Sequence, residues 1–126
     1  MTTGQNTPLA LYEPKSPQEQ AIKDVFLDFQ NGINTLNYSQ IENLIHDKAS
    51  IMIGRDRKIL SKAAYVDILP QRLAQNVSIA LGKPKMKVSG DKAEVKIYMT
   101  SGKYNLLIVY KMQFEKNKWY IQSWEY

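Results

Sequence analysis

Cysteine is absent from this chain of 126 residues, and histidine occurs once, as His46. Disulfide bridges, zinc–thiolate sites and thiol nucleophiles are therefore excluded, and so is a metal site built on paired histidines. Long apolar runs are missing too. No stretch approaches the roughly 18 residues of a membrane span, and residues 1–17 lack the basic start and apolar centre of a signal peptide. We therefore expect no membrane span, and a protein that is cytoplasmic, or exported if a signal segment has been removed.

Arginine is scarce, with Arg55, Arg57 and Arg72 as the only examples, so the net charge of +5 comes mostly from lysine. Lysine favours solubility and weak attraction to anions, whereas nucleic-acid recognition favours the bidentate contacts of arginine. Nucleic acid is therefore a poor candidate for a partner. There is no glycine-rich phosphate loop, and methionines at strand spacing suit packing better than copper binding. We expect neither a metal nor a cofactor.

The most informative stretch that is present runs from Pro84 to Tyr126. Two-residue turns at 91–92, 102–103 and 116–117 close three hairpins that agree on one inside and one outside face. Because a one-residue slip would flip every side chain, this agreement predicts an antiparallel meander in a defined register. The predicted facing pairs are Val88 with Val95, Met99 with Leu106, and Phe114 with Trp119. The predicted core face carries Met86, Val88, Val95, Ile97, Met99, Leu106, Ile108, Tyr110, Met112, Phe114, Trp119 and Ile121.

The N-terminal half predicts helices. Residues 1–15 have the polar and proline-containing composition of a flexible arm, and a single domain should follow over residues 16–126. Ser16 is an N-cap, Pro17 occupies the first helical position and Glu19 completes a capping box. An amphipathic stripe of apolar residues follows at three- and four-residue steps, so this helix must pack on a large apolar surface.

Shorter elements connect this helix to the meander. A second helix should begin at Ser39, a strand should cover residues 48–54, and Ser61 should cap a third helix that Pro70 ends or kinks. Residues 76–81 alternate as a strand that bends through Gly82 and Pro84 into the meander. Helices followed by a long antiparallel meander predict an α+β fold.

This order of elements resembles the nuclear transport factor 2-like superfamily, which includes SnoaL-like cyclases, ketosteroid isomerases and small bacterial domains of unknown function. The resemblance rests on the amphipathic first helix, on residues 88–95 (VSGDKAEV) and on residues 117–121 (NKWYI). It implies a cystatin-like cone, in which N-terminal helices pack on a strongly curved mixed or antiparallel sheet. It further implies that the open end of the cone holds a small molecule and that the outer face of the sheet makes dimers.

The register and the resemblance together predict an apolar ligand pocket lined by Phe29, Tyr65, Met86, Ile97, Ile108, Tyr110 and Ser123. In this register Tyr110 is opposite Ser123, and Glu125 is opposite Ile108. A carboxylate there would lose water and its pKa would rise, which suits a general acid or base. Glu125 is next to last, however, and strand ends fray, so Glu125 and Tyr110 are weak catalytic candidates. The catalytic positions of the resembled enzymes do not map onto this chain, and His46 should interact with the carbonyl end of the second helix.

The outer face of the predicted sheet gathers lysines on one side and apolar residues on the other. A solvated face would not carry such an apolar patch, whose composition is typical of an interface. We therefore predict a homodimer, with cover by the N-terminal arm as the alternative. The predicted dimer interface consists of Tyr98, Leu107, Val109, Trp124 and Tyr126.

These observations favour a non-catalytic, dimeric ligand-binding or assembly module with an apolar pocket. The alternative is a SnoaL-like or ketosteroid-isomerase-like enzyme that transfers a proton on a small apolar substrate. A third hypothesis is an envelope or secretion-associated assembly module, if the protein is exported. Fold alone does not decide among them.

Overall fold

The computed structural model describes residues 8–53, 56–72, 78–102 and 104–125. The helical elements are η2 (Leu9–Leu11), α1 (Pro17–Asn34), α2 (Tyr38–Asn43) and α3 (Lys62–Arg72). The strands are β1 (Ile45–Ile53), β2 (Lys58–Ser61), β3 (Ala80–Leu81), β4 (Lys85–Ser89), β5 (Lys92–Ser101), β6 (Tyr104–Glu115) and β7 (Lys118–Glu125).

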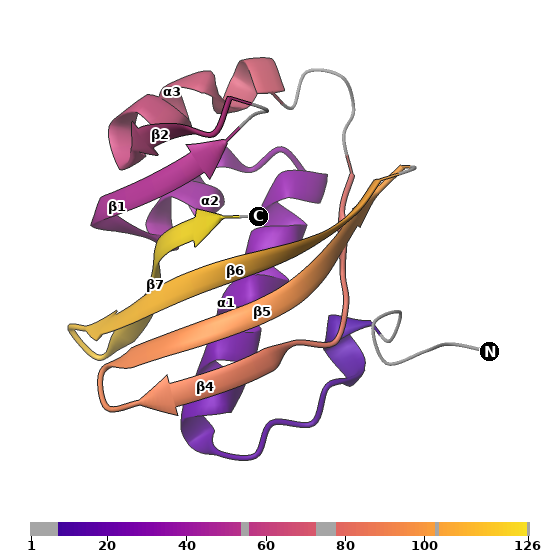
Figure 1. Cartoon of the computed structure of the whole chain (residues 1–126), viewed down its shortest axis with the longest axis vertical. Coiled ribbons are helices and arrows are strands. Elements are labelled where there is room, and N and C mark those ends of the chain that lie inside the picture. Colours follow the sequence, from indigo (N-terminus) through magenta and orange to yellow (C-terminus); the bar gives the residue numbers. More distant parts are fainter. Residues whose placement is uncertain (1–7, 54–55, 73–77, 103, 126) are drawn as a thin grey trace.

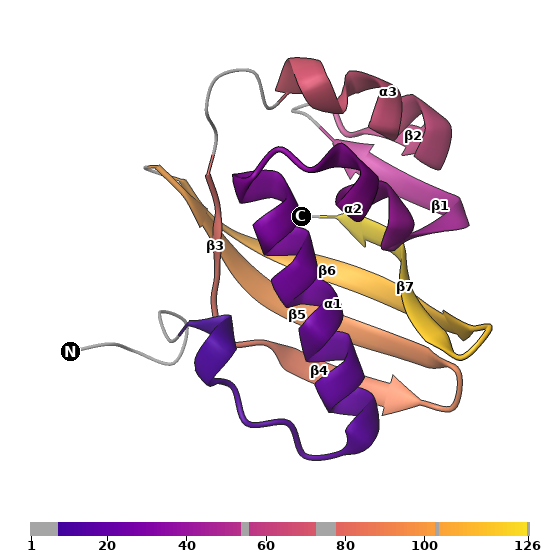
Figure 2. The ribbon, with the colours of Figure 1, turned by 180° about the vertical axis from the view of Figure 1, so that it is seen from behind.

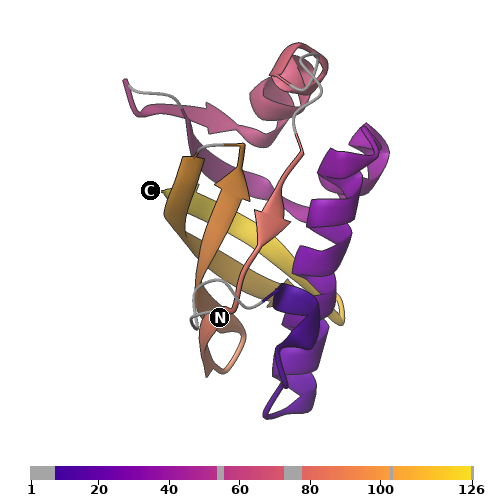
Figure 3. The same ribbon diagram turned by 90° about the vertical axis from the view of Figure 1, so that its right-hand side faces the viewer.

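The strands form one mixed sheet in the order β2-β1-β7-β6-β5-β3, and β4 also pairs with β5. The pairing of β1 with β7 is parallel and the other pairs are antiparallel. Helix α1 lies across one face of this sheet (Figures 1 and 2), and the edge view shows helix and sheet as two layers (Figure 3). The predicted α+β class, with helices on a curved sheet that wraps the first helix, is confirmed.

Helix α1 begins at the predicted residues, but Glu19 does not close the predicted capping box, because its carboxylate accepts from the Lys15 backbone N–H at 3.2 Å and not from that of Ser16. The Ser16 hydroxyl accepts a hydrogen bond from the Glu19 backbone N–H at 3.1 Å, and Pro17 is the first helical residue. The apolar stripe of α1 is buried against the sheet. Near its end, Gly32 allows α2 to approach closely, because a Cβ at this position would lie 2.9 Å from Ile41 Cγ1. Helix α2 itself starts earlier than predicted, with Asn37 rather than Ser39 as its N-cap.

Residues 8–15 are docked on the domain and do not form a free arm. Pro8 forms a β-bridge with Gly82, and the Leu9 side chain is only 1% exposed. The Lys23 ammonium donates hydrogen bonds to the backbone carbonyls of Ala10 and Tyr12, at 3.0 and 2.8 Å. The flexible-arm expectation is therefore wrong for this segment, and residues 1–7 lie outside the described residues.

Two of the three predicted hairpin registers are confirmed. Met99 pairs with Leu106 across β5 and β6, and Phe114 pairs with Trp119 across β6 and β7. The first hairpin turns one residue earlier than predicted, at Gly90-Asp91, which shifts the strand pairing by two residues, so Val88 faces Ala93 rather than Val95. Gly90 has φ +63°, a conformation that glycine adopts without steric cost, and the turn is therefore placed on it. A shift of two residues leaves every side chain on its predicted face.

A β-bulge in β7 overturns the predicted pairing near the C-terminus. Met112 pairs with Ile121, but the next residue back, Lys111, pairs with Ser123, so Gln122 is the additional residue. Beyond the bulge the alternation is inverted. Tyr110 is opposite Trp124, not opposite Ser123, and Glu125 is opposite Val109, not opposite Ile108. Burial of the Trp124 indole, opposite Ile51 of β1, gives this register its physical advantage.

Candidate ligand pocket

A cavity of about 260 Å³ lies between the helices and the inner face of the sheet. Its walls come from α1, α3 and strands β1, β5, β6 and β7, and most of its lining side chains are apolar. The lining residues are Phe29, Ile33, Met52, Ile53, Tyr65, Leu69, Arg72, Ile79, Met99, Ser101, Leu106, Ile108, Tyr110 and Trp124.

Four aromatic rings form one wall of the cavity. The Trp124 ring centroid lies 5.1 Å from that of Tyr65, 5.7 Å from that of Tyr110 and 5.8 Å from that of Phe29. Tyr110 also contacts Phe26, at 4.7 Å between centroids. These tilted and edge-to-face arrangements are favourable for aromatic pairs. They hold the wall rigidly, and they depend on the bulge that turns Trp124 inward.

The two phenols in this wall stay neutral at physiological pH. Burial raises the pKa of Tyr65 to about 12, with the nearby Arg72 charge opposing the rise. Burial also raises the pKa of Tyr110 far above its ordinary value, and the neighbouring Tyr65 phenol adds to that rise. Each hydroxyl therefore keeps its proton and can donate a hydrogen bond to an acceptor in the cavity.

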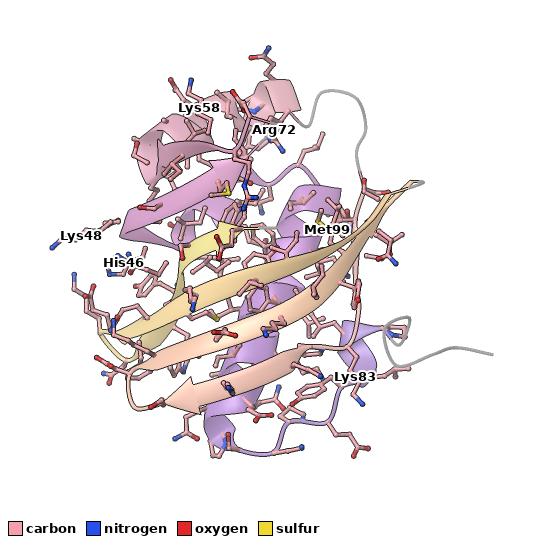
Figure 4. All side chains as sticks on the ribbon, in the orientation of Figure 1. His46, Lys48, Lys58, Arg72, Lys83 and Met99 are labelled. Carbon is pink, nitrogen blue, oxygen red and sulfur yellow. The ribbon has the colours of Figure 1, made fainter. Side chains whose placement is uncertain are left out.

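Arg72, at the end of α3, adds a permanent positive charge to the cavity lining. Figure 4 shows it on the helix side, with Met99 of β5 on the sheet side. A guanidinium can pair with a carboxylate in two parallel hydrogen bonds. The arrangement therefore offers an apolar wall, two neutral donors and one cation.

Four of the seven predicted pocket residues line the cavity: Phe29, Tyr65, Ile108 and Tyr110. The other three do not. Ile97 is fully buried in the core, Met86 borders a different groove, and Ser123 is on the outer face opposite Lys111. The predictions for Met86, Ile97 and Ser123 are wrong, in the case of Ser123 because of the bulge.

Trp124, Leu69 and Arg72 were missed. Leu69 carried a usable signal, since it lies four residues after Tyr65 on the same helical face. The inward position of Trp124 was also indicated by the sequence. Ile121 and Trp124 are three residues apart, whereas an unbroken strand would place its inner residues two apart, so the spacing itself indicated a bulge.

Glu125 does not reach the cavity. It is exposed beside Val109, beyond the bulge, so its predicted role as an inward acid or base is wrong. Among the described residues, the cavity lining contains no carboxylate and no imidazole. Tyr110 remains at the site.

His46 lies in β1, away from this cavity, and is 8% exposed. Its Nδ1 accepts a hydrogen bond from the Lys48 backbone N–H at 3.0 Å, so a neutral ring carries its proton on Nε2. Nε2 is 3.3 Å from a carboxylate oxygen of Glu115, without hydrogen-bond geometry. The expected contact with helix carbonyls is not found. In the described part of the chain, no cluster of three or more acidic or histidine side chains could hold a metal.

The outer face of the sheet keeps part of its predicted apolar patch. Leu107 is 43% exposed, and Tyr98 and Val109 are half-buried beside it. Trp124 is turned inward and is 7% exposed, so its predicted place in the outer patch is wrong, and Tyr126 lies outside the described residues.

The lysines of the outer face are arranged differently from the prediction. Lys87 is opposite Glu94, and Lys85 is opposite Lys96. Glu94 accepts from Lys111 at 3.1 Å and lies 3.7 Å from Lys96, and these contacts lower the pKa of its carboxyl, the hydrogen bond from Lys111 being the main cause. The carboxylate therefore offsets part of the like-charge repulsion on this face.

No family model matches the sequence, and no curated protein is similar enough to count as a relative. Solved structures do match in fold. A candidate calcium/calmodulin-dependent protein kinase II association domain from Xanthomonas campestris superposes with a TM-score of 0.77 at 9% identity, over 99% of this chain and 95% of that one. A nuclear transport factor 2-like protein from Cytophaga hutchinsonii has a TM-score of 0.71 at 12% identity, over 86% and 96% of the chains. A candidate ketosteroid isomerase from Shewanella frigidimarina has a TM-score of 0.69 at 16% identity, over 83% and 94%.

The protein therefore has the nuclear transport factor 2-like fold, which is also described as cystatin-like. The fold that the sequence pattern resembles is confirmed. Within the described residues, no helix has the length and apolar character needed to cross a membrane.

Proposed function

We propose that this protein is a non-catalytic, homodimeric module that binds a small, largely apolar ligand with an anionic or hydrogen-bond-accepting end. The observation that carries the proposal is the pair of neutral, buried phenols, Tyr65 and Tyr110, beside the Arg72 cation. The aromatic wall takes the apolar part of the ligand, and the phenols and Arg72 take its polar end.

The size of the cavity limits the ligand. A volume of about 260 Å³ corresponds to roughly nine water molecules at liquid density. It suits one or two fused aromatic rings with a single polar substituent. We therefore choose 2-naphthoate as the probe, and 2-naphthamide as its neutral analogue of the same shape.

Isothermal titration calorimetry tests the pocket. We expect saturable binding of 2-naphthoate, weakened about fivefold by Tyr65→Phe, because the lost hydrogen bond is worth about 1 kcal/mol. Arg72→Gln should remove the preference for naphthoate over naphthamide, while Arg57→Gln, which makes the same charge change outside the cavity lining, should not. Absence of saturable binding, or equal effects of the two arginine substitutions, would contradict the proposal.

The dimer is proposed to form through the outer patch of Tyr98, Leu107 and Val109. Support comes from the exposure of Leu107 on the outer face of the sheet, where a two-fold axis would let the patch meet its own copy. The fold-level likeness to an association domain is consistent with assembly.

The double variant Leu107→Glu/Val109→Glu should give a folded monomer, because it sets like charges against each other across the axis. Leu11→Glu, which changes another exposed apolar residue outside the patch, should leave the dimer intact. Light scattering measures the mass and circular dichroism checks the fold. A wild-type monomer at tens of micromolar, a concentration well above the usual dissociation constants of specific interfaces, would refute the dimer. A double variant that stays dimeric would refute it as well.

Proton-transfer catalysis on a small apolar substrate is the second candidate, and Tyr110 is the observation that favours it. Its raised pKa keeps the phenol protonated, so it can stabilise an enolate oxygen as a hydrogen-bond donor and does not serve as the base. Solvent deuterium exchange at the α-carbon of 2-tetralone, followed by NMR, tests this role. Exchange that Tyr110→Phe slows at least tenfold would support an enzyme over a binding module.

A further inference from the structure

A second depression, a groove of about 830 Å³, lies between the N-terminal segment and β4. Leu11 and Tyr12 border it on one side, and Met86 borders it on the other. Leu11 is 69% exposed and Met86 is half-buried, so the groove has an accessible apolar side chain on each side. The wall formed by the N-terminal segment is held in place by the two hydrogen bonds from Lys23 and by a 2.5 Å hydrogen bond from the Tyr12 hydroxyl to Glu19. The groove is therefore preformed.

Strand β4 contributes an open sheet edge to this groove. It pairs with β5 on one side, and no strand of the described chain pairs with its other side. Figure 1 shows β4 at the lower margin of the sheet. An edge of this kind presents a row of backbone N–H and C=O groups that can pair with another extended chain.

The charge of the groove is positive. No carboxylate of the described residues lies within ion-pair distance of Lys83, Lys85 or Lys87, and all three line the groove. Two of the carboxylates that border the groove are already engaged, Glu19 by the Tyr12 hydroxyl and the Lys15 backbone N–H, and Glu94 by Lys111. Figure 4 shows Lys83 ahead of β4, near the N-terminal segment.

We propose that the edge of β4 binds an extended acidic segment of another protein, which adds to the sheet as a further strand. Side chains alternate along an added strand. Those on the inner side would contact Leu11 and Met86, and those on the outer side would reach Lys85 and Lys87. The recognised segment therefore alternates apolar and acidic residues over about five positions, the length of β4.

Two other occupants fit less well. A second copy of this chain would bring its own Lys85 and Lys87 against the same residues, and lysine on an edge strand opposes such self-pairing. Nucleic acid would contact the lysines but would leave the unpaired backbone groups of β4 unused. The groove lining also includes no arginine that could form bidentate hydrogen bonds with a base or a phosphate. The backbone edge together with the lysines favours a peptide.

Fluorescence anisotropy with a labelled Val-Glu-Val-Glu-Val-Glu-Val peptide tests the proposal. We expect saturable binding to the full chain. N-methylation of the alternate peptide amides that face β4 should abolish it, whereas methylation of the other set should not. Lys85→Gln/Lys87→Gln should weaken binding roughly three- to tenfold, as two lost exposed ion pairs predict. Lys48→Gln/Lys58→Gln, the same charge change at the opposite margin of the sheet, should have no effect.

Several outcomes would overturn the proposal. If a peptide of the same composition with its acids grouped at one end binds equally well, or if neither methylation pattern matters, the attraction is charge alone and not strand addition. If oligothymidylate binds more tightly than the peptide and competes with it, the groove is a nucleic-acid surface. Circular dichroism of both double variants shows whether a loss of binding is a loss of fold. The result is independent of the cavity ligand, because none of these residues lines that cavity.

Discussion

Truncation of Trp124 is the most direct test of the C-terminal register. The indole is 7% exposed and contacts the rings of Phe29, Tyr65 and Tyr110. Replacing a buried tryptophan by alanine costs about 3–5 kcal/mol, and each favourable aromatic pair contributes about 0.5–1.5 kcal/mol of its own. We therefore expect Trp124→Ala to lower the free energy of unfolding by about 4 kcal/mol. That is a large share of the total of about 5–15 kcal/mol for a domain.

The neighbouring positions serve as matched controls. Ser123 and Glu125 are on the outer face in the observed register, so Ser123→Ala and Glu125→Ala should each change the free energy of unfolding by less than about 0.5 kcal/mol. Urea unfolding followed by circular dichroism measures all three variants. The protein concentration is kept fixed because dimerisation would alter apparent stability. A tolerated Trp124→Ala with a destabilising Ser123→Ala or Glu125→Ala would show that β7 has no bulge and that the wrong face is assigned.

Two further predictions concern the sheet and the phenols. Ile97→Asp should bury an unpaired charge and abolish the thermal unfolding transition. Lys96→Asp, next to it on the outer face, should leave the melting temperature within a few degrees of the wild-type value. The reverse result would show that the inner and outer faces of β5 are wrongly assigned. Burial raises the pKa of Tyr65 from about 10 in the unfolded chain to about 12 in the folded one. The contribution of the Tyr65 phenol to the free energy of unfolding should therefore be complete below pH 10, and about 3 kcal/mol of it should be lost as the pH rises through 12. Urea unfolding of wild type and Tyr65→Phe across this range measures the difference, and equal slopes would contradict a buried Tyr65 hydroxyl.

The fold was predictable where local chemistry and periodicity agree. Helix α1 has a serine cap, a proline at its first position and an apolar stripe, and all three are found in the structure. The hairpin at Lys116-Asn117 was predictable as well, since both residues adopt positive φ as the preferred two-residue turn requires. The turn at Gly90 was misplaced by one residue and the strand pairing by two, because both registers preserve the same inner face and periodicity cannot distinguish them.

The candidate pocket was less predictable, because its walls meet only in three dimensions. The meander register identified Ile108 and Tyr110, which lie on one strand of the inner face. The contribution of Arg72 depends instead on how α3 packs at the end of the sheet, and local patterns do not determine helix packing. The prediction placed Ile97 on the correct face of the sheet, but its side chain is fully buried. It therefore belongs to the core and does not line the cavity.

The bulge at Gln122 links the architecture to the proposed function. One additional residue in β7 exchanges the faces of Trp124 and Glu125, so the cavity gains an aromatic wall and the carboxylate is left on the outer surface. A pocket with a buried carboxylate would favour proton abstraction, because burial raises the pKa of an acid toward neutrality. A pocket with an indole, two protonated phenols and a guanidinium instead favours holding a ligand by its apolar body and its polar end. The choice between enzyme and binding module therefore depends on the register of the last four residues of β7.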